Sequence, residues 1–227
     1  MGLFHSPRIV TDQLKCLVDA NNPKSYSGSG STWTDLSGNN NNITHITGVS
    51  YNASGWFQYN GAAYSSIPNG TIVGDNNFSS MSIWFRVTTA PTTENYALIS
   101  DNFGPEWGLW YLTNGNATAY AYGARGTAAA VNKWHNLVVT SYTPAPNSGL
   151  TYTMQGFLNG VQISTDLSGT VGNGMDDTPL YVGADYNGNV PRNFFIGDIA
   201  QIALYQKILT PSEVKQNYNA LRGRFDV

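Results

Sequence analysis

The sequence has little cysteine and little charge. Of its 227 residues only Cys16 is a cysteine, and 11% are charged, against about 25% in an average globular chain. A lone cysteine forms no internal disulfide and supplies no thiolate set for structural zinc. We expect Cys16 to act as a small buried hydrophobe. Low charge is also found in some disordered chains, but the 13% aromatic content predicts a folded core.

Basic stretches and long apolar stretches are also missing. The net charge of −3 gives no positive surface for nucleic acid or anionic lipid. No apolar run approaches the roughly 18 residues of a membrane-spanning helix. Residues 1–8 lack the apolar stretch of a secretory signal. The sequence therefore predicts no nucleic-acid partner and no membrane insertion.

What the chain has instead is typical of an all-β domain. Threonine, valine, tyrosine, asparagine and glycine are abundant, so short strands alternate with turns. Asn159-Gly160 indicates a hairpin with a type I′ turn, because both residues tolerate a positive φ. The predicted strands recur about every ten residues, with turns between them, and this spacing favours a β-sandwich over βαβ units. They are predicted at residues 14–18, 56–59, 82–87, 96–100, 108–113, 117–122, 134–142, 151–158, 161–166, 180–183 and 195–205.

One helix is predicted near the C-terminus. Thr210, Pro211 and Glu213 place a hydroxyl at the N-cap, proline at N1 and glutamate at N3, which is the pattern of a capping box. Val214, Tyr218 and Leu221 then form one apolar stripe. The helix is expected to end before Arg222, with Gly223 where a C-cap would lie.

The chain reads as one domain, residues 14–221, with two flexible ends. The polar segment 19–42 is interpreted as an ordered loop pinned by a buried Trp33. Residues 222–227 form a C-terminal tail. Residues 1–13 form an N-terminal arm whose apolar side chains have no periodic partner, so we expect them to anchor the chain on another subunit: Leu3, Phe4, Ile9 and Val10.

Several ordered segments resemble the laminin-G-like group of the concanavalin A-like lectin/glucanase superfamily. The match runs over residues 14–221, and the segments that carry it are residues 17–26, 32–39, 78–85, 134–140, 157–160, 179–183, 195–205 and 209–213. This resemblance implies a two-sheet antiparallel jelly-roll sandwich closed by one short C-terminal helix.

A finer resemblance is to the version of this domain found in structural proteins of tailed bacteriophages. It is carried by residues 19–26 and 216–225. It implies a capsid decoration, spike or tail-associated subunit, bound to other virion proteins and self-associating. Such a particle is assembled in bacterial cytoplasm, where neither a signal peptide nor disulfides are needed.

No catalytic constellation is readable from spacing. Glucanases on this scaffold carry two glutamates and an aspartate alternating along one strand. Here Glu94, Glu106 and Glu213 are separated by loops. We therefore expect no enzyme. A glycoside hydrolase or lyase stays a remote alternative, because distant residues can assemble a site. His135, next to a strand tryptophan, is expected to be a hydrogen-bonded structural residue.

Metal binding and sugar binding are both implied by the family. One structural calcium could be held by loop oxygens of Asp101, Asn102, Asp185 and Asn187, although such residues also cap their own turns. The family's acidic pair before the last helix is replaced here by Ala200-Gln201, which weakens that comparison.

Sugar binding needs an aromatic ring to stack on the apolar face of a pyranose, with polar groups for its hydroxyls. Tyr120 and Tyr122 share one face of a predicted strand. The alternative role for such residues is packing in the core or against other subunits. The candidates are Trp107, Trp110, Tyr120, Tyr122, Arg125 and Tyr186.

Two functions follow. The first is a non-enzymatic virion subunit that binds other virion proteins and could display a face for host-surface polysaccharide. The second is a stand-alone carbohydrate-binding module.

Overall fold

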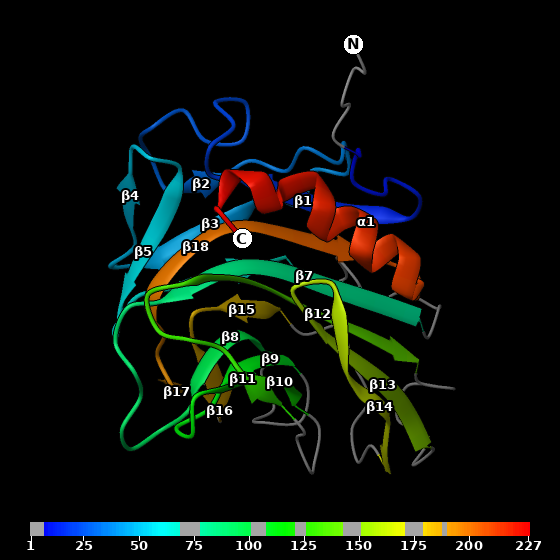
Figure 1. Ribbon diagram of the computed structural model, residues 1–227. Coiled ribbons are helices and arrows are strands. Elements are labelled where there is room, and N and C mark those ends of the chain that lie inside the picture. The colour runs from blue at the N-terminus through cyan, green and yellow to red at the C-terminus, as the bar shows by residue number, and fades with distance from the viewer. Residues whose placement is uncertain are drawn as a thin grey trace.

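The computed structural model describes residues 7–68, 78–100, 108–120, 126–142, 151–170, 179–187 and 190–227. Within these residues the strands form two large antiparallel sheets that pack face to face (Figure 1). One short helix follows the last strand. The all-β sandwich expected from the sequence is confirmed. Among the described residues no helix is long and apolar enough to cross a membrane.

The first sheet contains the longest strands. Its described strands run in the order β14 (Val161–Thr170), β13 (Thr151–Leu158), β12 (Trp134–Tyr142), β7 (Phe78–Val87), β18 (Ile196–Tyr205), β5 (Trp56–Asn60) and β4 (Ser50–Asn52). A further strand, β1 (Leu14–Asp19), pairs with the second half of β18, while β5 pairs with its first half.

The second sheet is built from shorter strands. Their order is β11 (Thr127–Ala128), β10 (Asn116–Tyr120), β9 (Gly108–Tyr111), β8 (Tyr96–Ser100), β15 (Leu180–Val182), β6 (Tyr64–Ile67), β3 (Ile43–Thr47) and β2 (Thr32–Trp33). A separate hairpin of β16 (Asp185–Asn187) and β17 (Val190–Arg192) follows β15. The sequence did not predict β2, β3, β4, β6, β11, β16 or β17 as strands.

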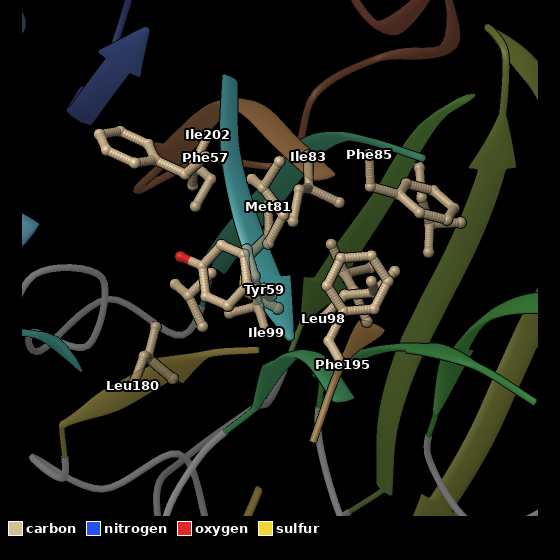
Figure 2. Packing of buried hydrophobic residues seen from close by; sticks show 14 of the residues in the cluster. Phe57, Tyr59, Met81, Ile83, Phe85, Leu98, Ile99, Leu180, Phe195 and Ile202 are labelled. Carbon is tan, nitrogen blue, oxygen red and sulfur yellow. The ribbon is translucent and has the colours of Figure 1, made fainter. Parts of the chain in front are cut away.

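The core lies between the inner faces of the two sheets. Met81, Ile83 and Phe85 alternate along β7 and face Leu98 and Ile99 of β8 (Figure 2). This two-residue period is what a strand with one face in the core requires. Trp33 is fully buried, which confirms that the polar segment 19–42 is pinned by this ring, and Cys16 is buried as expected.

Helix α1 (Pro211–Leu221) covers the outer face of the first sheet (Figure 1). Its predicted capping box is present, with the Thr210 hydroxyl accepting from the Glu213 backbone and the Glu213 carboxylate accepting from the Thr210 backbone. Val214 packs against Val138 and Ala203 of the sheet. The Asn159-Gly160 turn is also confirmed, with φ values of 53° and 74°.

The C-terminal tail is not a loose end. A 3-10 turn, Arg222–Arg224, continues from α1, so Gly223 is not the left-handed C-cap that the sequence indicated. Phe225 then packs on the rings of Trp84 and Trp134, at centroid distances of 4.3 and 4.8 Å. The expectation of a flexible C-terminal end is corrected by this packing.

The described part of the N-terminal arm also folds back on its own chain. Val10 is buried beneath α1; its backbone N–H donates to Asn217 at 2.8 Å and its carbonyl accepts from the Tyr205 hydroxyl at 3.1 Å. Val10 is therefore no free anchor for another subunit. Ile9 is half-buried and lines a small cavity under α1. Leu3 and Phe4 lie outside the described residues.

Candidate functional site

The hairpin β16–β17 folds over the outer face of the second sheet, and one buried carboxylate holds it there. Asp185, fully buried, accepts from the Arg192 Nε at 3.0 Å and from the Asn193 amide at 3.3 Å. On the sheet side, the Ser100 hydroxyl donates to the Ala184 carbonyl at 3.2 Å. These bonds fix the hairpin against β8.

Asp185 has a structural role. Burial raises the pKa of its carboxyl, and the hydrogen bonds and charge of Arg192 oppose that rise. A calcium ion here would have to displace Arg192, so Asp185 does not offer the open carboxylate that a calcium loop supplies. Among the described residues no group of three acidic, histidine or cysteine side chains is placed to hold a metal ion.

Four aromatic rings gather on this outer face; we call them the aromatic patch: Tyr64, Tyr181, Tyr186 and Phe194. Tyr181 and Tyr186 stack with centroids 3.8 Å apart and an interplanar angle of 15°. Tyr64 meets Tyr186 edge-on at 5.7 Å and lies 6.4 Å from Phe194. All four side chains are half-buried, so the patch keeps part of its ring surface in contact with solvent.

The strand register explains the patch. In β6 and β15 the alternate residues Ile67 and Leu180 point into the core, so Tyr64 and Tyr181 point outward. The hairpin then places Tyr186 on Tyr181. Burial and the neighbouring Tyr64 hydroxyl raise the pKa of Tyr186, so its hydroxyl stays protonated at neutral pH and can donate as well as accept.

A pocket of about 330 Å³ adjoins the patch through Phe194. One wall is the connection between β7 and β8, and the other is the segment after β17. Its lining residues are Gly61, Thr89, Ala90, Pro91, Thr92, Thr93, Glu94, Asn95, Tyr96, Asn193, Phe194 and Ile196. This volume lies at the lower end of the range for small-ligand sites, about 300–1,000 Å³.

The pocket has a rigid floor. The Asn193 carbonyl accepts from the Ala97 backbone at 2.9 Å, and the Phe195 carbonyl accepts from Gly61 at 3.1 Å. Asn193 itself has a φ of 54°, a left-handed conformation that asparagine tolerates better than most residues. The hydrogen bond from the Asn193 side-chain amide to Asp185 therefore links the pocket floor to the hairpin that carries Tyr186.

The outer face of the first sheet carries an arginine–aspartate ion pair between tryptophan rings. Arg86 lies 5.0 Å from both the Trp56 and Trp134 ring centroids, and its Nε and Nη2 both donate to Oδ2 of the buried Asp198, at 2.8 and 2.7 Å. Burial raises the pKa of Asp198, while Arg86 opposes the rise. His135 donates from Nε2 to the Ala130 carbonyl at 3.1 Å, and its Nδ1 accepts from the Asn159 amide at 3.2 Å, which confirms the expected hydrogen-bonded, structural role.

The structure supports one of the sugar-binding residues predicted from the sequence, contradicts another and does not describe the side chains of the rest. Tyr186 lies in the aromatic patch. Trp110 points to the same outer face of the second sheet but is 1% exposed, so its ring cannot stack on a sugar, and this prediction is corrected. Trp107, Tyr122 and Arg125 lie outside the described residues, as do Asp101 and Asn102 of the calcium proposal. Tyr120 and Asn187 lie in strands, but their side chains are outside the described part.

Tyr64, Tyr181 and Phe194 were missed. Tyr181 lay within a predicted strand, and the flanking Leu180 and Val182 already indicated that it points away from the core. Tyr64 lay in a segment with no strand prediction. No local signal could have paired these residues with Phe194.

A family model described as the concanavalin A-like lectin/glucanases superfamily (Laminin_G_3) matches residues 59–215. The chain belongs to this superfamily. No curated protein sequence matches the chain.

Solved structures with the same fold include enzymes and binding domains. A Trypanosoma rangeli sialidase in complex with 2,3-difluorosialic acid aligns with a TM-score of 0.71 at 14% identity, over 98% of this chain and 36% of the sialidase chain. This superfamily member thus spans about a third of the sialidase chain, and at such identity the likeness is one of fold.

Two further structures are individual domains of larger proteins. Domain 4 of AbnA, a GH43 extracellular arabinanase from Geobacillus stearothermophilus solved with arabinotriose, aligns with a TM-score of 0.61 at 18% identity, over 91% of this chain and 98% of that domain. The binding domain of Paraclostridial Mosquitocidal Protein 1 aligns with a TM-score of 0.64 at 21% identity, over 92% of this chain and 52% of that one.

Proposed function

We propose that this lectin/glucanase-like sandwich is a non-catalytic carbohydrate-binding domain, and that the aromatic patch and the adjoining pocket form its site. The observation that carries the proposal is the continuity of the two: Phe194 lines the pocket and also contacts Tyr64 of the patch. A glycan could stack one sugar ring on the patch while the next enters the pocket.

The chemistry of the site suits a sugar. A pyranose has an apolar face that stacks on aromatic rings and hydroxyls that need donors and acceptors. Three of the four rings of the patch carry phenol hydroxyls, and the pocket supplies threonine hydroxyls together with the Asn95 amide nitrogen and the Asn193 amide oxygen. The domain 4 structure solved with arabinotriose supports the same use of the fold.

The described carboxylates argue against hydrolysis. Glycoside hydrolysis needs two carboxyl groups about 5–9.5 Å apart, one on each side of the bond. Asp185 and Asp198 are each held by an arginine, and Glu213 caps α1 and pairs with Lys207. Within the described residues, Glu94 is the single carboxylate that lines the pocket, so the pocket has no carboxylate pair.

The test is a calorimetric titration of the full chain with glycans selected on an array. Tyr186→Ala removes the outermost ring of the stacked pair and should weaken binding about tenfold, which is about 1.4 kcal/mol. Val161→Ala, which trims an apolar side chain that is 66% exposed elsewhere, should leave the affinity unchanged.

Two outcomes would count against the proposal. The first is that the wild-type chain binds no glycan on the array. The second is that Tyr186→Ala binds as tightly as the wild type while its melting temperature shows that the variant is folded.

A virion role is the second candidate. It rests on the resemblance of residues 19–26 and 216–225 to phage structural proteins. These two segments meet in the fold, where the Arg224 guanidinium donates to Asp19 at 2.6 Å and to the Gly55 carbonyl at 2.7 Å. A sandwich attached to a particle could still display the aromatic patch to host-surface polysaccharide.

The virion candidate is tested by particle composition. Purified phage particles that contain the gene for this chain should contain the protein in fixed copy number. Loss of its incorporation when Leu3 and Phe4 are both replaced by serine, in a variant whose melting temperature is unchanged, would support attachment through the N-terminal arm. Particles that never contain the chain would rule the role out and leave the stand-alone binding module.

A further inference from the structure

The described lining of the pocket beside the aromatic patch carries one negative charge and no positive charge. Of the lining residues only Glu94 is charged, and its side chain is exposed. No ion pair or hydrogen bond among the described residues engages this carboxylate. Glu94 therefore places a negative charge on the pocket lining that no described side chain neutralises.

No lysine or arginine from the described residues lines the pocket to offset Glu94. Arg192 lies on the neighbouring hairpin, but its guanidinium is bound to the buried Asp185 at 3.0 Å, so the charge of the pair is balanced. An acidic ligand would thus meet one carboxylate and no unpaired cation of the lining.

The remaining polar groups of the lining are neutral. Thr89, Thr92 and Thr93 are exposed, and no hydrogen bond within the described part of the chain uses their hydroxyls. Each hydroxyl is both a donor and an acceptor, which matches the hydroxyls of a sugar without requiring charge.

We propose that this site selects non-acidic glycans, with a neutral or amino sugar in the pocket, and that Glu94 is the residue that rejects acidic sugars. The inference rests on the proposed function, because it names the substrate class of the same site.

The size of the effect follows from electrostatics. Two like charges about 4 Å apart at a solvent-exposed site repel enough to change an equilibrium about fivefold or more. A protonated amino group in the same position would be attracted by a comparable amount, and both effects should weaken with added salt.

The experiment compares three ligands that differ in one substituent. They are the neutral glycan that binds best on the array, its terminal uronate, and its 2-amino analogue. Each is titrated into the full chain by calorimetry. Wild type should bind the neutral and amino forms at least about fivefold more tightly than the uronate.

Two variants locate the cause. Glu94→Gln keeps a side chain of the same shape with hydrogen-bonding capacity but without charge, so it should bring the uronate to within about twofold of the neutral glycan. Asp12→Asn removes one negative charge beside α1, where Asp12 pairs with Lys207, and should leave the discrimination intact.

The outcomes separate the two proposals. If the uronate binds as tightly as the neutral glycan, or if the discrimination survives Glu94→Gln, the inference about Glu94 is overturned while sugar binding stands. If none of the array glycans binds, the proposed function itself fails and the inference fails with it.

Discussion

His45 shows how a single residue is tuned by its surroundings. It lies on β3 among the rings of Phe57, Trp33 and Tyr26, with the Phe57 centroid 4.2 Å away. Its Nδ1 is 2.8 Å from the Ser65 hydroxyl, while its Nε2 is buried and has no partner among the described residues. Burial lowers the pKa of the imidazole from 6.5 to about 4.

This lowered pKa predicts acid sensitivity. Below pH 6.5 the unfolded chain takes up a proton at His45 that the native state refuses until about pH 4. Stability from this residue is therefore complete above pH 6.5 and falls by about 3 kcal/mol as the pH drops to 4. Urea unfolding at pH 7 and pH 4.5 measures the loss.

His45→Phe is the matched variant, because it fills the same aromatic pocket and cannot titrate. The drop in unfolding free energy between pH 7 and pH 4.5 should be smaller in the variant by about 2–3 kcal/mol. Equal drops in both proteins would show that His45 is not buried as described.

At the scale of elements, local signals predicted well and non-local ones did not. The capping box of α1 and the Asn159-Gly160 turn are written in a few adjacent residues, and both are present. Strands such as β2, with two residues, and β16, with three, are too short to show a period. β2 pairs with β3 and β16 with β17, each near in the sequence, whereas β6, which was also missed, pairs with the distant β15, and no local pattern reveals that pairing.

The ends of the chain illustrate the same limit. Nothing in residues 222–227 predicted that Phe225 would stack on Trp84, because that contact depends on where the first sheet carries its tryptophans. Likewise Val10 has no periodic neighbour in its own segment, yet Asn217 and Tyr205 from the far end of the chain bind its backbone.

At the scale of the molecule, the two sheets differ in what covers them. The outer face of the first sheet is closed by α1, the 3-10 turn and Phe225 (Figure 1). The outer face of the second sheet carries the aromatic patch, which stays half-exposed. This asymmetry is the physical basis for placing the binding site on the second sheet.

The candidate site was only partly predictable. Tyr186 could be proposed as a loop aromatic, but its neighbours come from β6, β15 and the segment after β17, which are brought together by pairing such as Ser66 with Tyr181. Trp110 looked equally suitable in sequence and is buried instead. Composition identifies aromatic residues, whereas only the packed sheet decides which rings reach solvent.

The central claim is that this face of the second sheet binds glycans without reacting with them. The most direct measurement is an amide NMR titration of the full chain with the best array glycan, followed over hours for product. We predict the largest shift changes in residues 61–67, 89–96 and 190–196, with the glycan intact. Shifts confined to residues around α1, or steady cleavage of the glycan, would contradict this account.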